Sequence, residues 1–220
     1  MKVCCISDLH SKINFSIDPC DLLIIAGDVC PAVWNRNMNC IVQERWLIDF
    51  FIPWLNKQDT KEVVFIAGNH DWIWDLAPTM VPEMPSNFHY LCDNFIEIMG
   101  LKIYGTPQQK YFNDWAFNRT NTQLEKYYAN IPEGLDILLT HIPPFKILDK
   151  VMEGDHQGCK VLLSRLKEMK NPPRYHIFGH IHEGYGITDI QNTKYINCSL
   201  MDGSYRMINK PVYIDIEILK

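Results

Sequence analysis

Residues that commonly bind metal ions occur in five short motifs of this 220-residue chain. Each motif directly follows an apolar run that has the length of a buried strand. The motifs are Asp8-Leu9-His10, Gly27-Asp28, Gly68-Asn69-His70-Asp71, Thr140-His141 and Gly179-His180-Ile181-His182. Because open α/β sheets bind ligands at the ends of their strands, the five motifs could meet in one site.

The donor types favour a pair of divalent cations. Carboxylate, amide and imidazole groups without thiolate suit manganese, iron or zinc better than the soft sites that cysteine builds. Two cations about 3.5 to 4 Å apart need a bridging carboxylate, and Asp28 is the candidate for this role. Asp8 and His10 lie two residues apart and project to the same side of an extended segment, as do His180 and His182. Each pair could therefore serve one site.

A plainer interpretation exists for each of these residues taken singly. One Asp or His after a strand is more often a helix cap or a hydrogen-bonded polar residue than a metal ligand. Five such motifs in one chain are much harder to explain in this way. The set as a whole therefore predicts a metal site.

Alternating apolar runs and amphipathic segments would position these motifs. Helical spacing is clearest at residues 40–56 and 160–169, and residues 108–122 lack a steady period, which indicates a surface loop beside a pocket. The alternation predicts a layered α/β fold. No repeat, low-complexity segment or linker marks a boundary, so we expect one domain over residues 1–220. The expected strands span residues 3–6, 22–26, 63–67, 101–104, 137–139, 176–178, 195–198 and 212–218.

The overall composition argues against several other classes of protein. A formal net charge of -5 leaves no basic field of the kind that holds a long nucleic acid. The eight cysteines lack the short spacings of zinc modules or disulfide-rich domains, so we expect reduced thiols in the core. No apolar run has the length of a membrane span or the pattern of a signal peptide. We therefore expect a cytoplasmic protein without a membrane partner.

Taken together, the five motifs closely resemble those of the calcineurin-like metallophosphoesterases in order and spacing. Within that superfamily, three segments resemble the brain-type metallophosphoesterase-domain proteins, a group linked to class III cyclic nucleotide phosphodiesterases. These segments are DWAFN at 114–118, THIPP at 140–144 and YHIFGHIHEGYG at 175–186. The resemblance implies a four-layer α/β/β/α fold, in which a β-sandwich of two mixed sheets is flanked by helices.

The resemblance also implies a role for each ligand residue. One cation would be held by Asp8, His10, Asp28 and His182, and the other by Asp28, Asn69, His141 and His180. Manganese is the activator expected by resemblance, and iron, zinc, nickel, cobalt or magnesium could occupy the same donors. His70 would act as the general acid, because a histidine can donate a proton near neutral pH. Asp71 could orient His70 or cap a helix.

The reaction implied by the resemblance is hydrolysis of a phosphodiester. A hydroxide that bridges the cations would attack phosphorus, while the cations spread the developing negative charge. A small substrate such as a cyclic nucleotide is favoured, and we expect no obligate protein partner. A nuclease of the DNA-repair type is the alternative, which the acidic balance disfavours. A non-catalytic scaffold is the third hypothesis, and the intact Asp28 and His70 argue against it.

Four further residues could contact the substrate. Trp115, Phe117 and Asn118 could stack on or hydrogen-bond to a nucleobase, although aromatic residues in a loop often form a small core instead. His156 lies in a segment that resembles a loop near the active site in the same family, and it could touch the substrate. We interpret His89 and His176 as packing or surface residues, because neither follows an expected strand.

Overall fold

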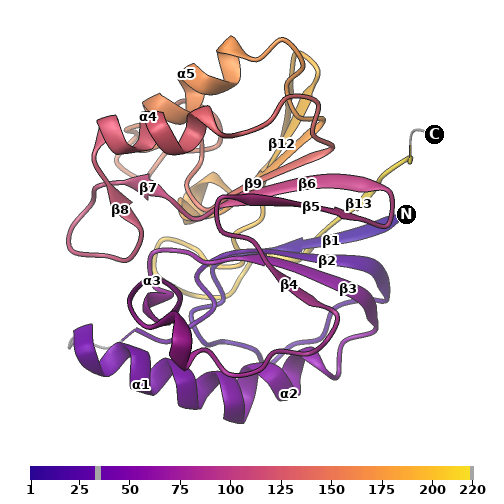
Figure 1. Ribbon diagram of the computed structural model, residues 1–220, viewed down its shortest axis with the longest axis vertical. Coiled ribbons are helices and arrows are strands. Elements are labelled where there is room, and N and C mark those ends of the chain that lie inside the picture. Colours follow the sequence, from indigo (N-terminus) through magenta and orange to yellow (C-terminus); the bar gives the residue numbers. More distant parts are fainter. Residues whose placement is uncertain (33–35, 219–220) are drawn as a thin grey trace.

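The computed structural model describes residues 1–32 and 36–218, and two β-sheets packed face to face form its centre (Figure 1). The strand order of the first sheet is β13 (Val212–Asp215), β1 (Lys2–Ile6), β2 (Cys20–Ala26), β3 (Thr60–Ile66) and β4 (Phe88–Tyr90). The strand order of the second sheet is β11 (Gly186–Ile190), β12 (Thr193–Asn197), β10 (Tyr175–Phe178), β9 (Ile137–Thr140), β6 (Leu101–Thr106) and β5 (Asn94–Ile98).

Helices cover the outer face of each sheet. The first sheet is covered by α1 (Arg36–Trp46), α2 (Ile52–Leu55) and α3 (Trp72–Leu76). The second sheet is covered by α4 (Asn121–Ala129) and α5 (Lys160–Glu168). This arrangement confirms the predicted four-layer α/β/β/α fold. None of the helices in the described ranges is long and apolar enough to cross a membrane.

Both sheets are mixed, and their central strands are parallel. In the first sheet β1, β2, β3 and β4 run parallel, whereas β13 runs antiparallel to β1. In the second sheet β6, β9, β10 and β12 run parallel, and the edge strands β5 and β11 are antiparallel to their neighbours. The parallel strands of each sheet therefore end together at one edge.

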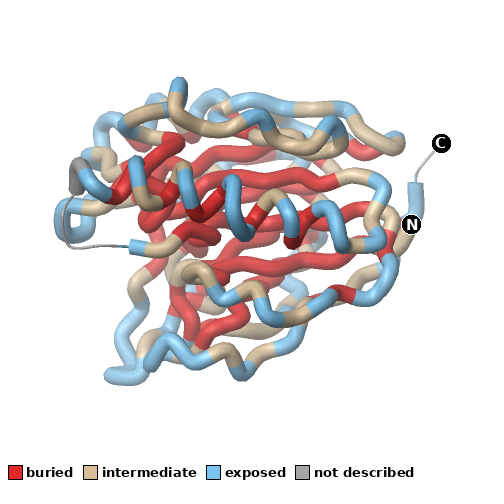
Figure 2. The backbone as a smooth tube through the Cα atoms, turned by 90° about the horizontal axis from the view of Figure 1, so that it is seen from below, coloured by how far each residue is buried: buried red, intermediate tan, exposed pale blue. Residues whose placement is uncertain are grey.

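Apolar side chains cover both faces of the central strands. Val3 and Ile24 pack between the sheets against residues such as Ile103, whereas Cys4 and Leu23 pack toward the helices of the first sheet. Strands that are buried on both faces have continuous apolar sequences, not alternating ones. Figure 2 shows these buried strands in red, running through the interior beneath a partly exposed helix.

All eight predicted strands are present, although β13 ends at Asp215, before the predicted end at residue 218. The prediction missed β4, β5 and β11, which are all edge strands. The pattern of β5 is mostly exposed or half-buried, because one side of an edge strand faces solvent. It therefore lacks the apolar run by which a central strand is found. A short pair, β7 (Gln109–Lys110) and β8 (Asn118–Arg119), lies in the segment predicted as a loop.

The helix predicted at residues 40–56 is divided into three consecutive segments. A π-helical turn, η1 (Leu47–Phe51), separates α1 from α2. Pro53 lies in the first turn of α2 and has no backbone N–H, so the regular hydrogen-bond ladder cannot pass through it. The helix predicted at residues 160–169 is confirmed as α5. Two short 3-10 turns, η2 (Pro78–Met80) and η3 (His182–Gly184), complete the helical segments of the described residues.

The prediction missed α4, although the sequence carries a signal for it. Thr120 precedes the helix and forms a capping box with Gln123, in which each side chain accepts a backbone N–H from the other residue. A Thr-x-x-Gln pattern is typical of a helix start. The predicted loop at residues 108–122 therefore ends where α4 begins.

All eight cysteines lie in the described part of the chain and are free thiols. Seven are buried, as predicted. Cys92 is exposed in the loop between β4 and β5, so the prediction that all eight belong to the core was wrong at this position.

Candidate metal centre

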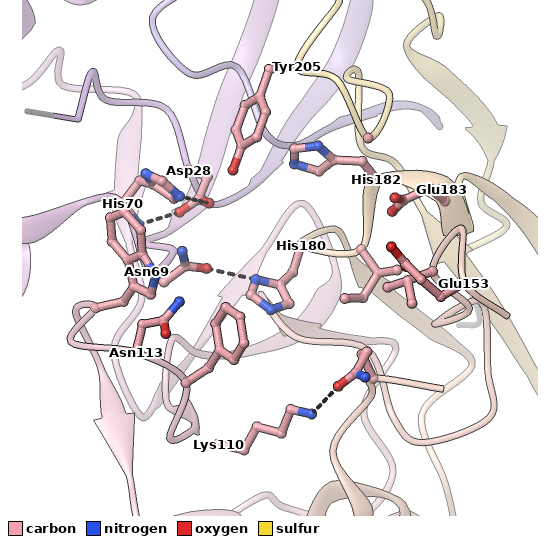
Figure 3. A pocket seen from close by; sticks show the side chains of 16 residues that line it. Asp28, Asn69, His70, Lys110, Asn113, Glu153, His180, His182, Glu183 and Tyr205 are labelled. Atoms are coloured by element: carbon pink, nitrogen blue, oxygen red, sulfur yellow. Dashed lines mark hydrogen bonds and ion pairs between the residues drawn. The ribbon is translucent and has the colours of Figure 1, made fainter. Parts of the chain in front are cut away.

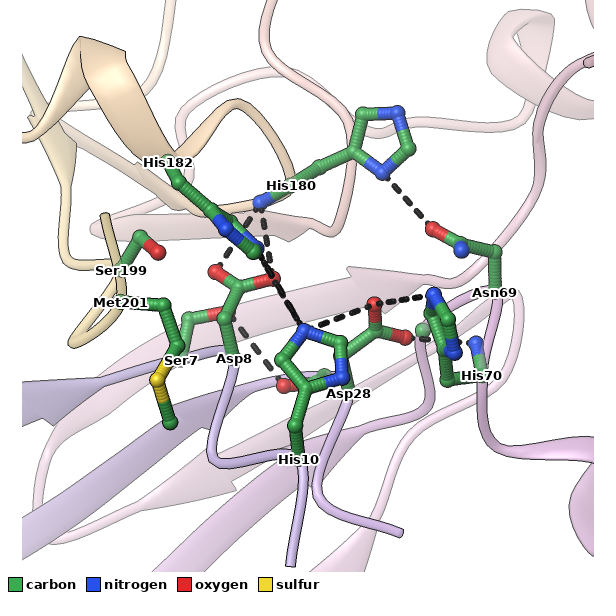
Figure 4. Close-up of polar contacts among 12 residues, drawn as sticks. Ser7, Asp8, His10, Asp28, Asn69, His70, His180, His182, Ser199 and Met201 are labelled. Carbon is green, nitrogen blue, oxygen red and sulfur yellow. Dashed lines mark hydrogen bonds and ion pairs between the residues drawn. The ribbon is translucent and has the colours of Figure 1, made fainter. Parts of the chain in front are cut away.

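The five motifs converge where the parallel strands of both sheets end. In chain order, the residues are Asp8 and His10 after β1, Asp28 after β2, Asn69 and His70 after β3, His141 after β9, and His180 and His182 after β10. Figure 4 shows seven of these side chains pointing toward one another from the two sheets. The sandwich thus brings together residues that lie up to 174 positions apart, from Asp8 to His182.

Four of these residues have a left-handed backbone. The φ angles of Asp8, His10, Asp28 and His180 are 57°, 42°, 55° and 68°. Residues other than glycine rarely adopt this conformation, which costs on the order of 1–3 kcal/mol for each residue. The surrounding structure must hold such strain, and strain of this kind clusters at functional sites. The backbone at the strand ends is therefore held in a conformation that directs these side chains toward one another (Figure 4).

Two glycines allow the backbone to approach these side chains closely. Gly27 has a φ angle of +95°, and a Cβ atom there would lie 2.6 Å from Nδ1 of His141. A Cβ atom on Gly68 would collide with the carboxylate of Asp28. Only glycine therefore fits at either position.

Asp8, His10, Asp28 and His182, the residues predicted to hold the first cation, are called the first ligand group. Nε2 of His182 lies 3.5 Å from Oδ1 of Asp8 and 3.4 Å from Nε2 of His10. Nε2 of His10 lies 3.8 Å from Oδ2 of Asp28. The ligand atoms of Asp8, His10 and His182 lie within 4.8 Å of one another, so one ion could contact all three.

Asp28, Asn69, His141 and His180, the residues predicted to hold the second cation, are called the second ligand group. Nε2 of His141 lies 3.2 Å from Oδ2 of Asp28 and 3.0 Å from Oδ1 of Asn69. Nδ1 of His180 lies 2.7 Å from the same Asn69 oxygen. Asp28 belongs to both groups, which is the position that a bridging carboxylate requires. The nitrogen and oxygen donors of the two groups fit two divalent ions of borderline hardness.

Neighbouring imidazoles keep the two buried carboxylates ionised. Burial alone would raise the pKa of Asp8, but the hydrogen bond and charge of His182 bring this pKa below its ordinary value. Burial likewise opposes the ionisation of Asp28, and His141 lowers the pKa of Asp28 well below its ordinary value. Burial would lower the pKa of His141, yet the Asp28 carboxylate raises it to about 9. A cation bound here would replace the proton on His141.

Two of the other imidazoles are neutral and can offer a lone pair. Burial lowers the pKa of His10 to about 4 and the pKa of His180 to about 3. Both rings therefore remain unprotonated at neutral pH. A metal ligand must be deprotonated, so these two residues already have the form that an ion requires.

Backbone carbonyls orient two of the rings. Nδ1 of His141 lies 2.8 Å from the carbonyl oxygen of Ala26, and Nδ1 of His182 lies 3.0 Å from that of Asp202. A ring that donates its Nδ1–H to a carbonyl presents Nε2 as the ligand atom. In both residues Nε2 faces a carboxylate of the ligand groups.

Asp71 supports the loop that carries Asp28, a role that the sequence did not reveal. Its buried carboxylate accepts hydrogen bonds from the backbone N–H groups of Asp28, Val29, Cys30 and Gly68, at 2.8 to 3.0 Å. Asp71 precedes α3, but its side chain makes no capping hydrogen bond. Neither of the two roles predicted for Asp71 describes these contacts.

His70 stands at the edge of the ligand groups. Its Nε2 lies 4.0 Å from Oδ2 of Asp28, and its ring packs against Trp115 with 4.2 Å between the ring centroids. By distance alone, His70 could share an ion with His10 and Asp28. The backbone N–H of His70 donates to Oδ1 of Asp28 at 2.7 Å. Burial lowers the pKa of the His70 ring below its ordinary value.

A cavity of about 510 Å³ opens beside the ligand groups (Figure 3). Of the converging motif residues, Asp28, Asn69, His70, His180 and His182 line it, whereas Asp8, His10 and His141 do not. Its walls include Lys110, Phe112 and Asn113, from the segment predicted to lie beside a pocket, and Glu153, Glu183 and Tyr205, which the sequence did not assign to the site. The volume lies in the range of small-molecule sites in proteins.

The four predicted substrate-binding residues lie in different places. Trp115 lines the cavity. Phe117 is 2% exposed and packs into the core of the first sheet and its helices. Asn118 does not line the cavity, but its amide group donates to the carbonyls of Phe112 and Asn113 and thereby fixes a loop that does. His156 pairs with Asp149 at 2.5 Å and lines a neighbouring cavity.

The two histidines interpreted as packing or surface residues lie outside the ligand groups. His89 pairs with Glu62 at 2.8 Å on β3 and β4. His176 is fully buried on β10, and its Nε2 lies 2.9 Å from the hydroxyl of Thr140. Both contacts are structural, as predicted.

Comparison with known proteins identifies what this chain is similar to. Residues 1–184 match the family model described as calcineurin-like phosphoesterase. The human metallophosphoesterase domain-containing protein 1 is 34% identical, over 96% of this chain and 70% of that protein. A UPF0046 protein from Caenorhabditis elegans is 44% identical, over 99% of this chain and 60% of that protein. One solved structure, 18% identical, superposes with a TM-score of 0.64 over 89% of both chains, which supports the fold.

Proposed function

The chain belongs to the calcineurin-like phosphoesterase family, and from this premise we propose that it hydrolyses a small phosphodiester such as a cyclic nucleotide. Membership makes it a metal-dependent hydrolase of phosphoesters and confirms the resemblance of its motifs. The observation that supports the finer proposal is that members of both ligand groups, Asp28 and His182 of the first and Asn69 and His180 of the second, line one cavity of limited size.

Eight ligand positions, with Asp28 counted in both groups, would hold two divalent cations. Asp8, His10, Asp28 and His182 would hold one, and Asp28, Asn69, His141 and His180 the other. When bound, the cations would supply positive charge to the phosphoryl oxygens and acidify the attacking water. The donor set accepts several first-row ions, and we propose manganese as the activator.

The carboxylates and imidazoles of the chain prepare the floor of the cavity for a phosphoryl group. Asp8 and Asp28 are ionised, and the carbonyls of Ala26 and Asp202 fix two of the imidazoles. Because these groups are already in place, little reorganisation is needed when the ester binds. The chain thus contributes positioning, which is the main requirement of phosphoryl transfer.

We propose His70 as the general acid that protonates the departing oxygen. Nε2 of His70 is 4.0 Å from Asp28, which is too long for a hydrogen bond and leaves this nitrogen able to contact a substrate atom. The ring is held in place by Trp115 on one side and by its backbone bond to Asp28. A positioned histidine that donates a proton typically accelerates a reaction by about 10²–10⁴-fold.

The walls of the cavity support a small substrate. Trp115 and Phe112 offer aromatic faces to a base, and Asn113 and Lys110 offer hydrogen-bond donors nearby. A cavity of about 510 Å³ holds a nucleotide-sized ligand. The net charge of -5 disfavours a long nucleic acid as the main substrate.

Hydrolysis assays on metal-stripped protein, with and without added Mn²⁺, would test the proposal. We expect Mn²⁺-dependent cleavage of bis-p-nitrophenyl phosphate and of cyclic nucleotides, with slower cleavage of p-nitrophenyl phosphate. A preference for single-stranded DNA would replace the proposal with a nuclease function. Inactivity on all four substrates, with two ions bound per chain, would overturn the proposal and point to a scaffold.

A further inference from the structure

Tyr205 lies over the candidate metal centre, although none of the five motifs contains it. It belongs to the loop between β12 and β13 and lines the cavity. Its ring meets those of His10 and His182 edge-on, with centroids 4.8 and 5.0 Å apart. Figure 3 shows its hydroxyl group pointing into the cavity toward Asp28. The phenol therefore faces the same space as both ligand groups.

The backbone of Tyr205 is held in an unfavourable conformation. Its φ angle is 58°, and a bulky residue with a positive φ angle is a genuine outlier. Asp202 maintains this conformation: its carboxylate accepts from the N–H groups of Ser204 and Arg206 at 2.9 and 2.8 Å and from the Arg206 guanidinium at 2.8 Å. Lys12 also donates to the carbonyl oxygen of Tyr205. Strain that several contacts maintain is expected where it serves function.

One carbonyl group connects this loop to a ligand residue. The carbonyl oxygen of Asp202 accepts the backbone N–H of Tyr205 at 2.8 Å, and Nδ1 of His182 lies 3.0 Å from the same oxygen. A bridge between Met201 and Met207 closes the base of the loop. The position of the Tyr205 ring is therefore fixed relative to the His182 ring.

The contacts with His10 and His182 explain the position of the Tyr205 ring, but they do not involve its hydroxyl group. In the part of the chain that the structure describes, this hydroxyl has no hydrogen-bond partner. The hydroxyls of Tyr128 and Tyr185, in contrast, donate to backbone carbonyls at 2.8 and 2.9 Å. Tyr205 is also 48% exposed, so its hydroxyl is accessible to a bound molecule.

We propose that Tyr205 is a catalytic residue whose hydroxyl group donates a hydrogen bond to a non-bridging phosphoryl oxygen of the ester. This inference rests on the proposed function and adds a second donor to it. The rings of Tyr205 and His70 lie near each other beside Asp28 (Figure 3), with 6.4 Å between their centroids, and both line the cavity, so a phosphoryl group in the cavity could meet both. His70 would serve the departing oxygen, and Tyr205 an oxygen that gains negative charge in the transition state. Tyr205 keeps its proton throughout.

The substitution Tyr205→Phe tests the role of the hydroxyl while it keeps the ring. In the manganese-loaded protein, we expect kcat for bis-p-nitrophenyl phosphate to fall about 10- to 100-fold, the loss typical of one hydrogen bond to a charged group. The KM, the metal content and the melting temperature should stay near those of the wild type. Tyr111→Phe is the matched control, because Tyr111 is 67% exposed and lies outside the cavity lining. A Tyr205→Phe variant with kcat within twofold of wild type would overturn the proposal.

Binding of orthovanadate and inorganic phosphate provides a test that does not depend on the ester. Vanadate adopts the five-coordinate geometry of phosphoryl transfer, so a donor to the transition state should favour it over phosphate. We expect Tyr205→Phe to weaken vanadate binding about 10-fold and phosphate binding less, measured by calorimetry. If the wild type cleaves no diester but this difference appears, the substrate class is wrong and Tyr205 keeps its role. Equal vanadate affinity in both proteins would overturn the role of Tyr205.

Discussion

The ligand groups and the cavity wall beside them differ in how they are built. Asp8 and His141 are fully buried at strand ends and held by backbone contacts, whereas Phe112 and Tyr205 are about half exposed on loops. The strand ends fix donor atoms in place. The loops, which can vary without disturbing the sheets, present aromatic and polar groups to the substrate. The difference indicates that the strand ends set the positions of the predicted ligands, whereas the loops shape the space in which the ester would lie.

Removal of the carboxylate shared by both ligand groups should have the largest effect. We expect Asp28→Asn to lose at least one cation and to lower kcat by about 10³-fold or more. Metal content by mass spectrometry and turnover of bis-p-nitrophenyl phosphate would measure both effects. Asp189→Asn, at an exposed ion pair on β11, is the control. If Asp28→Asn kept two cations and full activity, the strand ends would not determine the reaction.

Removal of His70 should separate proton donation from metal binding. We expect His70→Ala to keep both cations and to lose about 10²-fold in kcat with alkyl leaving groups. With p-nitrophenolate, which leaves without a proton, the loss should be small. A plot of rate against leaving-group pKa would show a steeper slope for the variant. His89→Ala, at the His89–Glu62 pair, is the matched control. A variant that loses its cations would show that His70 is a ligand.

A substitution at Asp71 should act on the ligand groups through the backbone. The Asp71 carboxylate accepts hydrogen bonds from four backbone N–H groups. In Asp71→Asn, an amide NH₂ group takes the place of one carboxylate oxygen, so the hydrogen bonds to that oxygen are lost. We expect Asp71→Asn to reduce the free energy of unfolding by about 2–3 kcal/mol and to weaken metal affinity. Urea denaturation and metal titration would measure the two effects. Unchanged values in both would show that the strand-end loop does not need this support.

The smallest effect on catalysis is expected at the cavity wall. We expect Phe112→Ala to raise the KM for a cyclic nucleotide about 5- to 10-fold, because a stacking surface is lost, and to leave kcat and stability unchanged. Phe117→Ala is the contrasting variant. Because the ring of Phe117 is buried, we expect this variant to lose about 3–5 kcal/mol in the free energy of unfolding. If Phe112→Ala lowered kcat instead, Phe112 would take part in the reaction and not only in binding.

The convergence of the predicted ligand residues could be foreseen from the sequence because strand ends leave a strong pattern. Each apolar run is buried on both faces, so its end is easy to locate, and the following polar residue stands out. The edge strands β4, β5 and β11 could not be found in this way, since one side of each faces solvent. Of the edge strands of the two large sheets, β13 was found, because it carries the apolar residues Val212 and Ile214.

The cavity wall was predicted less well, because its residues carry no periodic pattern. Trp115 and Phe117 belong to one aromatic segment, but they lie in different surroundings. Phe117 has a left-handed backbone, and its ring packs in the core. Trp115 lines the cavity. Tyr205 reaches the site only through the folding of a loop that is distant in sequence from every motif. Asp71 acts through backbone N–H groups, which no sequence pattern displays. Contacts that depend on loop conformation were therefore beyond the sequence.

The left-handed backbone at Asp8, His10, Asp28 and His180 has an evolutionary consequence. Glycine at any of these positions would relax the backbone, at the expense of a ligand. At Asp8 and Asp28, however, glycine would also remove the carboxylates that accept the backbone N–H groups of His180 and His70, so the relief of strain is offset there. A lineage released from selection for catalysis would therefore be expected to replace His10 before either carboxylate.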